Sequence, residues 1–278
     1  MNIYYQWVPG SYSSMAAAQV QNIYTWIRSC IWVKHFDDVR KEVEQGNGIA
    51  VLPIENSYAG TIHRNVYNFL QYNHIILSDI ILPINHCLMW ISETYPEIDI
   101  NYKAHSHPQA LAQTYDYCKK NNIWQHDNAD TAWAALYISK LQDPSQIAIA
   151  SEQAAVLYGL HIYDRAIQDQ EGNQTRFLIT AHPEYIPKTK KIEHCKSSIQ
   201  KITLMFAVRN IPGVLYKCLW AFATHGIDLT KIESLPSQED PFTYIFWIEC
   251  LWDQKSEKRE SCMQELWFYT THVRNLSK

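Results

Sequence analysis

The stretch HIILSDIILPINHCLMWI, residues 74–91, is a long run of residues that favour β-structure. It exceeds the usual strand length of five or six residues, which favours an extended segment that leaves one sheet and enters another. A return crossing is expected near GLHIYDRAIQD, residues 159–169. Two crossings of this kind divide a chain into two lobes with a cleft between them.

Short apolar strands alternate with amphipathic helical stretches on both sides of the first crossing, from residue 2 to about residue 181. Before the crossing, IYYQWV, IWVKHF and GIAVLPI predict strands, and SMAAAQVQNIYTWI, DVRKEVEQ and TIHRNVYNFLQ predict helices. After it, NYKAHSH, NIWQ and QIAIA predict strands, and PQALAQTYDYCKK and ADTAWAALYISKL predict helices. This alternation predicts an α/β architecture in both lobes.

The C-terminal part of the chain forms a separate predicted unit. Residues 183–199 contain two prolines and several lysines with little apolar periodicity, which is typical of a linker. The following segments predict the order β-α-β-β-α, with a short last strand near HVRNL. This is a ferredoxin-like βαββαβ plan, common in small-molecule-sensing modules. The expected domains are therefore 1–182 and 200–278, joined by the linker.

Composition excludes several classes of function. The net charge is -4 with 19% charged residues, so no nucleic-acid or anionic-membrane partner is expected. The N-terminus lacks a signal-peptide pattern and no apolar run approaches a membrane span, which predicts a cytoplasmic protein. Seven cysteines without a CxxC pair favour reduced, buried thiols. His105 and His107 lack a third ligand at a plausible spacing, so no metal site is expected.

Two early segments place polar residues where a packed core would not hold them. In VPGSYSSMAAAQ, residues 8–19, a predicted helix start favours an anion, to which Ser11 and Ser13 add donors. Ordinary N-capping explains only one of these serines. In LPIENSYAG, residues 52–60, the polar triplet follows the carboxyl end of a strand, where open α/β sheets place ligands. A turn or an Asx cap is the alternative for this triplet.

Two later segments have the same character. In HSHPQALAQTYDYC, residues 105–118, Ser106 and Gln109 fit a capping box, while Gln113 points away from the apolar stripe. In GNQTRFLIT, residues 172–180, strand alternation predicts that Arg176 takes the face opposite its two neighbours. Thr175 and Arg176 then reach one ligand only if the pocket wraps the beginning of the strand. The alternative is that the arginine pairs with a nearby acid such as Asp169 or Glu171.

Taken together in their order along the chain, these four segments resemble the prephenate dehydratase family, and the resemblance extends over nearly the whole chain. The matching stretches are PGSYS, PIENS with Gly60, HSHPQALAQ, DTAWAA, IAIASEQAAVLYGL, NQTRF and, further on, IPGVLYKCLWAFATHGIDLTKIESLP. The resemblance implies a two-lobed catalytic domain like a type II periplasmic binding protein, followed by a ferredoxin-like ACT domain. It implies a carbon–oxygen lyase that converts prephenate to phenylpyruvate for phenylalanine biosynthesis, without a cofactor or metal.

The resemblance also implies residue roles and partners. The catalytic residues by family pattern are Thr175, Arg176, Glu55, Asn56, Ser57, Ser106 and Gln113. The implied substrate-binding residues are Ser11, Tyr12, Ser13, Thr131 and Phe177. The ACT domain implies feedback by phenylalanine at Gly213, Val214, Leu215, Glu233 and Ser234, and assembly as a homodimer or homotetramer.

The chain departs from the family pattern in places that leave alternatives open. Trp7 and Trp133 stand where the family usually has small residues, so they either fill a core or narrow the pocket. Leu235 replaces the arginine of the family's ESRP motif, which leaves phenylalanine sensing open. Nothing separates prephenate from arogenate, its amino-acid counterpart. A solute-binding protein or a catalytically inactive sensor is the alternative outside enzymes.

Overall fold

The computed structural model describes residues 1–94, 102–186, 199–209, 211–237, 244–253 and 258–277. It divides into two compact units, each treated by itself. The first comprises Met1–Val66 and Asp79–Tyr185, and the second comprises Tyr67–Ser78 and Ile186–Lys278. The predicted linker, 183–199, lies largely outside the described residues, apart from the 3₁₀ turn η1 (Pro183–Tyr185). The domain limits drawn from the sequence therefore stay predictions.

The first lobe of unit 1 is built on a mixed sheet with the strand order β2-β1-β3-β11-β5, to which β4 adds beside β3. β1 pairs in parallel with β2 and β3, whereas β11 runs antiparallel to β3. Its strands are β1 (Asn2–Gln6), β2 (Cys30–Val33), β3 (Gly48–Asn56), β4 (Gly60–Thr61), β5 (Ile75–Pro83) and β11 (Gln174–Ala181). Its helices are α1 (Tyr12–Ile23), α2 (Phe36–Glu44) and α3 (His63–Gln71).

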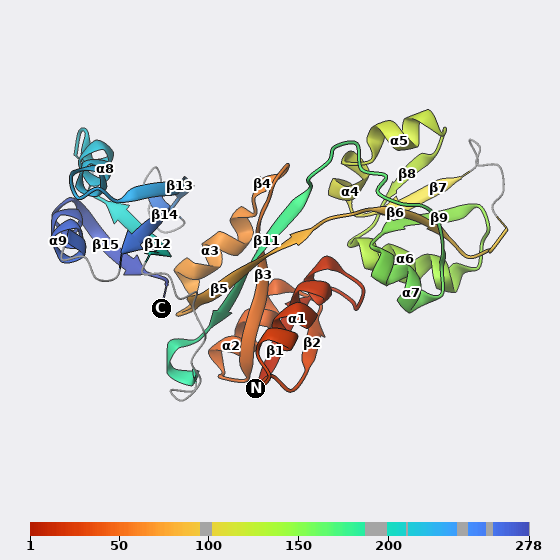
Figure 1. The fold of residues 1–278 in the computed structure, drawn as a ribbon, viewed down its shortest axis with the longest axis horizontal. Helices are drawn as coiled ribbons and strands as arrows, with labels where there is room; N and C mark the ends of the chain where they lie inside the picture. Colours follow the sequence, from red (N-terminus) through yellow and green to blue (C-terminus); the bar gives the residue numbers. More distant parts are fainter. Residues whose placement is uncertain (95–101, 187–198, 210, 238–243, 254–257, 278) are drawn as a thin grey trace. The chain divides into compact units, whose positions relative to one another are not determined.

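The second lobe has a five-stranded sheet with the order β10-β6-β9-β7-β8 (Figure 1). Its strands are β6 (Cys87–Trp90), β7 (Lys103–Ser106), β8 (Trp124–Asp127), β9 (Gln146–Ala150) and β10 (His161–Asp164). Its helices are α4 (Pro108–Ala112), α5 (Tyr115–Lys120), α6 (Thr131–Leu141) and α7 (Glu152–Tyr158). The α/β alternation expected for both lobes is confirmed.

Strand alternation explains why helices cover both faces of this second sheet. Ala148 and Ala150 of β9 pack with α6 and α7, whereas Ile147 and Ile149 pack with residues of α4 and α5. Successive side chains of a strand point to opposite faces, so a strand of only apolar residues needs a helix layer on each side. The apolar run IAIA, residues 147–150, is therefore the central, doubly covered part of a three-layer lobe.

Both crossings between the lobes lie where the sequence predicts them, and they are bonded to each other. The first joins β5 to β6 through residues 84–86, and the second joins β10 to β11 through residues 165–173. The Ile84 N–H donates to the Asn173 carbonyl at 2.8 Å, and the Ile167 N–H donates to the His86 carbonyl at 3.0 Å. These bonds hold the two connecting segments together as one short ladder between the lobes.

A second contact between the lobes forms where α7 meets the loop that precedes α1. The Ser151 hydroxyl caps α7 by accepting from the Ala154 N–H, and it donates to the Gly10 carbonyl at 2.7 Å. Gly10 has a φ of +88°, and a Cβ added to it would lie 3.0 Å from the Ala154 Cα. Both the backbone angle and the close approach require glycine here.

Unit 2 has the ferredoxin-like topology that the sequence predicts. Its antiparallel sheet has the order β13-β14-β12-β15, and its two helices share a core with that sheet. Its elements are β12 (Ile199–Val208), α8 (Val214–Thr224), β13 (Asp228–Pro236), β14 (Tyr244–Asp253), α9 (Lys258–Tyr269) and β15 (Thr270–Asn275).

The segment 67–78 belongs to this unit because its backbone is anchored by β15. The Arg274 guanidinium donates to the carbonyls of Phe69, Tyr72 and His74 at 2.7–2.9 Å. Carbonyls at the end of a helix lack intrahelical partners, so a cation that caps several of them is favourable.

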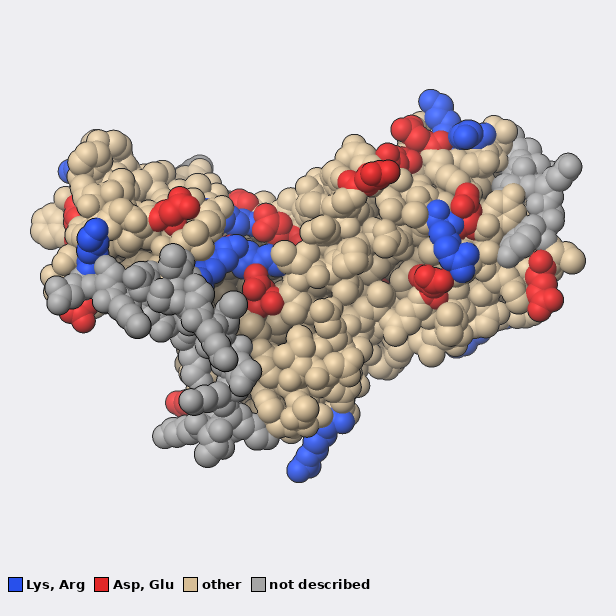
Figure 2. Space-filling model, viewed as in Figure 1, with Lys and Arg blue, Asp and Glu red and all other residues tan. Residues whose placement is uncertain are grey.

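The surface and the helix lengths give two further observations. On the face shown in Figure 2, the described lysines and arginines are interspersed with acidic side chains. Within the described ranges, no helix is both long enough and apolar enough to cross a bilayer.

Replacing Gly10 with Ala should destabilise the fold more than the same change at Gly159. Both glycines have positive φ, which costs an L-residue about 1–2 kcal/mol. Only Gly10 also faces a close backbone neighbour, since an added Cβ at Gly159 would meet no atom within 4 Å. Urea unfolding of both variants should show the larger loss for Gly10→Ala. Equal losses would mean that the contact between this loop and α7 is not tight.

Candidate active site

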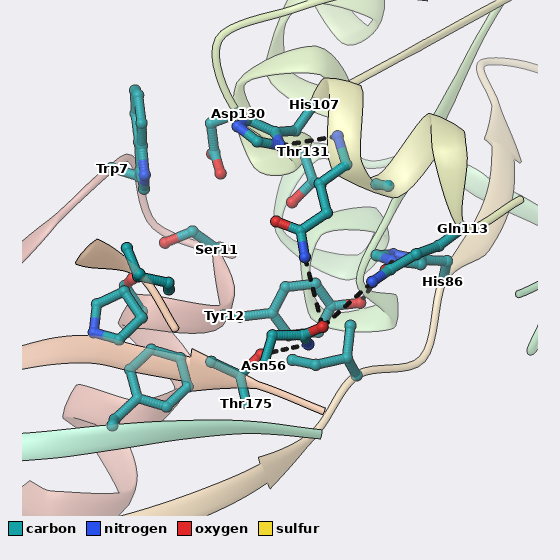
Figure 3. A pocket seen from close by; sticks show the side chains of 17 residues that line it. Trp7, Ser11, Tyr12, Asn56, His86, His107, Gln113, Asp130, Thr131 and Thr175 are labelled. Atoms are coloured by element: carbon teal, nitrogen blue, oxygen red, sulfur yellow. Dashed lines mark hydrogen bonds between the residues drawn. The ribbon is translucent and has the colours of Figure 1, made fainter. Parts of the chain in front are cut away.

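A cavity of about 160 Å³ lies in unit 1 between the two lobes. A cavity of this size has room for a single six-membered ring. Figure 3 shows side chains reaching it from both lobes, with Asn56 and Thr175 on one side and Asp130 and Thr131 on the other. Eight residues selected from the sequence line it, namely Ser11, Tyr12, Ser13, Asn56, Gln113, Thr131, Thr175 and Phe177.

Thr175 and Asn56 are neighbours in the pairing of β11 with β3, and their side chains form the centre of the site. The Asn56 amide oxygen accepts from the N–H groups of Tyr58 and Ala59 at 3.1 and 3.0 Å. Because these groups can only donate, the amide nitrogen must face the other way. It donates to the Thr175 hydroxyl oxygen at 3.0 Å and to the Asn173 side-chain oxygen at 2.8 Å. The Thr175 hydroxyl hydrogen is thereby left for a ligand.

The orientation of Asn56 propagates to the side chains behind it. Since the Asn173 oxygen accepts from Asn56, its amide nitrogen donates to the Gln113 Oε1 at 2.9 Å. That oxygen must also accept from the His86 Nε2, which lies 3.1 Å away. The Nε2 therefore carries the proton in the neutral ring, and Nδ1 faces the Tyr12 hydroxyl at 3.2 Å.

His86 is a site residue that the sequence reasoning missed. Burial lowers its pKa to about 4, against an opposing bond to Gln113, so the ring is neutral at pH 7. Its signal in the sequence is a polar residue inside the apolar run of residues 74–91. The contact of His86 with Gln113 of the second lobe is what identifies it as a site residue, and the sequence does not show this contact.

Helix starts supply the other polar groups of the cavity. The Ser11 hydroxyl accepts from the Ser14 N–H at 3.2 Å and caps α1. The Asp130 carboxylate accepts from the N–H groups of Ala132 and Trp133, both at 3.1 Å, and caps α6. Burial raises the pKa of Asp130 to about 6, although these backbone bonds act in the opposite direction.

The structure does not bring Arg176 to the cavity. Its guanidinium pairs with Asp79 at 2.5 Å, on the face of β11 opposite Thr175. The acids proposed from the sequence, Asp169 and Glu171, are not the partner in this ion pair. Glu55 lies opposite Arg176 in the strand register and is likewise outside the cavity lining. The register of β11 against β3 shifts between Arg176 and Phe177, yet this irregularity does not bring the Arg176 guanidinium to the cavity.

Ser57 and Ser106 also lie outside the cavity lining and make structural bonds. The Ser57 hydroxyl accepts from the Gln174 N–H at 3.0 Å and steadies the start of β11. The Ser106 hydroxyl donates to the Ile149 carbonyl at 2.6 Å. The predicted capping box is wrong, because His107 rather than Ser106 caps α4.

The two tryptophans that depart from the family pattern, Trp7 and Trp133, lie in different surroundings in this unit. Trp7 lines the cavity and holds a φ of +82°, a costly angle for a bulky residue. Trp133 is 46% exposed and is not among the lining residues. Across the described ranges, no group of three or more His, Cys, Asp or Glu is arranged to hold a metal ion.

The residues assigned to phenylalanine sensing lie at two places in unit 2. Gly213 caps α8 with a φ of +71°, next to buried Val214 and partly buried Leu215. Glu233 and Ser234 are on β13, where the Glu233 carboxylate lies 3.8 Å from the Lys231 ammonium.

The fold and the cavity define a class of protein in which two α/β lobes enclose a polar cleft and a ferredoxin-like unit follows. A family model described as prephenate dehydratase matches residues 3–185. The chain belongs to the prephenate dehydratase family.

Curated relatives agree with this family, and solved structures share the fold. The chain is 34% identical to a chloroplastic Arabidopsis thaliana protein named arogenate dehydratase/prephenate dehydratase 2, covering 99% of this chain and 72% of that protein. Arogenate dehydratase 5 of the same plant is 35% identical, with 99% and 66% coverage. A prephenate dehydratase from Arthrobacter aurescens, solved with L-Phe, has a TM-score of 0.83 at 21% identity and covers 99% of this chain and 88% of that chain. A structure described as a quorum-quenching acylase has a TM-score of 0.80 at 26% identity, covering 100% and 97%.

Replacing His86 with Gln should reduce the acid sensitivity of the fold. Between pH 6.5 and about 4, the unfolded chain binds a proton at His86 that the folded chain excludes. The contribution of His86 to the free energy of unfolding therefore falls as pH drops through this window, by roughly 3 kcal/mol at most. Thermal melting between pH 4 and 7 should show a shallower decline for His86→Gln.

The control is His35→Gln, which removes an exposed histidine and should keep the wild-type slope. The raised pKa of Asp130 gives a slope of the opposite sign in all three proteins, so their comparison isolates His86. Equal slopes for His86→Gln and wild type would contradict a histidine held neutral by burial.

Proposed function

We propose that the chain is a carbon–oxygen lyase that catalyses the decarboxylating dehydration of prephenate to phenylpyruvate, with arogenate as the alternative substrate. The main support is the Thr175 hydroxyl, which accepts from Asn56 inside the cavity and has its hydrogen available. In the reaction, the ring carboxylate leaves as carbon dioxide and its bonding electrons form the new ring double bond. The ring hydroxyl leaves and takes up one proton to form water.

Thr175 acts in this proposal as a fixed donor to the departing oxygen. A free alcohol is too weak an acid near neutral pH to serve as an efficient general acid. A preorganised hydrogen bond in a site that excludes water still stabilises developing negative charge. Asn56 provides the preorganisation, because its amide cannot rotate away from Thr175 without breaking two backbone bonds.

The substrate's anionic groups have to be bound without Arg176. The described residues that line the cavity include no Lys or Arg. The start of α1, with Ser11, Tyr12 and Ser13 on the cavity wall, offers the positive end of a twelve-residue helix. This is the expected binding position for one carboxylate of the substrate.

The acylase among the structural relatives raises a second activity, which the geometry does not favour. An acylase that uses a hydroxyl nucleophile requires an adjacent base to take its proton. In the described structure the Thr175 oxygen contacts the Asn56 amide, and the His86 Nδ1 faces Tyr12 instead. Donation from a fixed hydroxyl fits these contacts better than activation of a nucleophile.

Thr175→Val should lower kcat about 100-fold or more while substrate still binds, a loss of the size seen when one donor to a developing oxyanion is removed. The matched control is Thr180→Val on the same strand, since the buried Thr180 hydroxyl has no partner within the described structure. This control should keep near-normal turnover. Phenylpyruvate or phenylalanine release is measured with each substrate, and near-normal kcat for Thr175→Val would remove Thr175 from the mechanism.

We further propose that unit 2 binds phenylalanine as an allosteric ligand at the start of α8, in a homodimer or homotetramer. A Cβ added to Gly213 would meet no atom within 4 Å, so the helix start is open. Leu235 is 1% exposed, which makes it a packing residue where the family pattern has an arginine. Binding is therefore expected to depend on the helix start rather than on that position.

Phenylalanine should raise the melting temperature of the full chain in proportion to ligand excess over Kd. A ligand that binds only the folded state stabilises it by about 2.7 kcal/mol at 100 times Kd. Differential scanning fluorimetry with L-phenylalanine and, as the control, D-phenylalanine measures this effect. The absence of any shift at millimolar L-phenylalanine would contradict the allosteric site.

A further inference from the structure

The side of the cavity opposite Thr175 carries a carboxylate. Asp130 is 7% exposed and lines the cavity, and Figure 3 shows its carboxylate on the side away from Asn56 and Thr175. Among the described residues of the lining, it is the one acidic side chain, and none is Lys or Arg. A buried carboxylate without a cation beside it is costly in free energy.

Capping a helix explains the position of Asp130 but does not require an aspartate. The bonds from the Ala132 and Trp133 N–H groups both go to one oxygen, Oδ2, of the carboxylate. Asn, Ser and Thr cap helix starts as well as or nearly as well as Asp, without a net charge. Ser11 and Ser151 do so for α1 and α7 in the same unit. The negative charge at the start of α6 therefore suggests a second role.

The neighbouring residue supports a ligand on this side of the cavity. Thr131 is buried and lines the cavity, and its hydroxyl has no hydrogen-bond partner within the described structure. Buried hydroxyls are normally bonded, so one without a partner in a residue that lines the cavity is suited to a polar group of the ligand. A carboxylate and a hydroxyl side by side are both acceptors for an ammonium group.

The two candidate substrates differ in charge at the α-position of their side chain. Prephenate has two carboxylates and a keto group, whereas arogenate has an α-ammonium in place of the keto group. A buried aspartate repels a dianion and attracts an ammonium, and it does so strongly where water is excluded. Burial raises the pKa of Asp130 to about 6, and a cation beside the carboxylate acts in the opposite direction because it favours the charged form.

We propose that Asp130 is a specificity-determining residue that pairs with the α-ammonium of arogenate, with the Thr131 hydroxyl as a second acceptor. The ring hydroxyl then faces Thr175 at the other side of the cavity, and the preferred product is phenylalanine. This inference rests on the proposed dehydratase function and selects between its two substrates. Prephenate is accordingly the poorer substrate of the wild type.

The test compares the full-length wild type with Asp130→Asn, which keeps a helix-capping side chain and removes the charge. Steady-state kinetics with arogenate and with prephenate should show a wild-type kcat/KM at least about tenfold higher for arogenate. Asp130→Asn should lower kcat/KM for arogenate by about 10- to 100-fold, mainly through KM. The KM for prephenate should fall, because the repulsion of its carboxylates is removed.

Two further variants protect the test against structural effects. Asp143→Asn removes the same charge from a turn outside the cavity lining. Its kcat/KM should equal that of the wild type with both substrates. Asp130→Ser retains a capping hydroxyl and should repeat the loss with arogenate if Asp130→Asn does not fold. Circular dichroism and thermal melting establish that each variant is folded.

Five outcomes decide the inference. A shift of preference from arogenate towards prephenate in the folded Asp130 variants supports it. A wild type that prefers prephenate, or equal losses with both substrates, overturns it. If the wild type binds arogenate more tightly than prephenate in calorimetry but converts neither, the proposed function fails and only the pairing of Asp130 with an ammonium group is supported. If it binds neither molecule, both fail.

Discussion

The side chain of Asn56 is held by two backbone N–H groups in the turn that follows β3. Because a backbone N–H has no acceptor role, this contact determines which end of the amide faces Thr175. The orientations of Asn173 and Gln113 and the tautomer of His86 follow in sequence. A turn of a few residues thus sets the direction of every hydrogen bond in the network. Networks that satisfy all their members favour one arrangement over others.

This network also connects the chemistry of the site to the architecture of unit 1. Asn56 belongs to the first lobe and Gln113 to the second, whereas His86 and Asn173 lie on the two crossing segments. Separation of the lobes would break the bonds from Gln113 to the crossing segments. The relative position of the lobes and the alignment of Thr175 are therefore stabilised by the same interactions.

The distribution of charge in the cavity is as informative as its hydrogen bonds. Strand alternation turns Arg176 to the other face of β11, where Asp79 partners it. The cavity wall then includes the start of α1, whose helix dipole is positive, and the Asp130 carboxylate at the start of α6. A site of this kind separates ligands by the sign of their groups at each end, because burial strengthens both attraction and repulsion.

The sequence alone determined the elements and their order. Alternation and amphipathic periodicity are local properties, so they predicted the two lobes, both crossings and the ferredoxin-like unit. They also placed Thr175 and Phe177 on one face of their strand and Arg176 on the other. Resemblance to the family then selected eight residues that line the cavity.

Only the tertiary structure decided which polar side chains meet. His86 and Asp130 were missed because the first looks like an interruption of an apolar run and the second like an ordinary helix cap. Ser106 and Ser57 look like site residues in the sequence, yet their hydroxyls bond to backbone groups. Each of these outcomes depends on contacts between residues far apart in the chain. Local periodicity has no information about such contacts, because they form only when distant segments of the chain pack against each other.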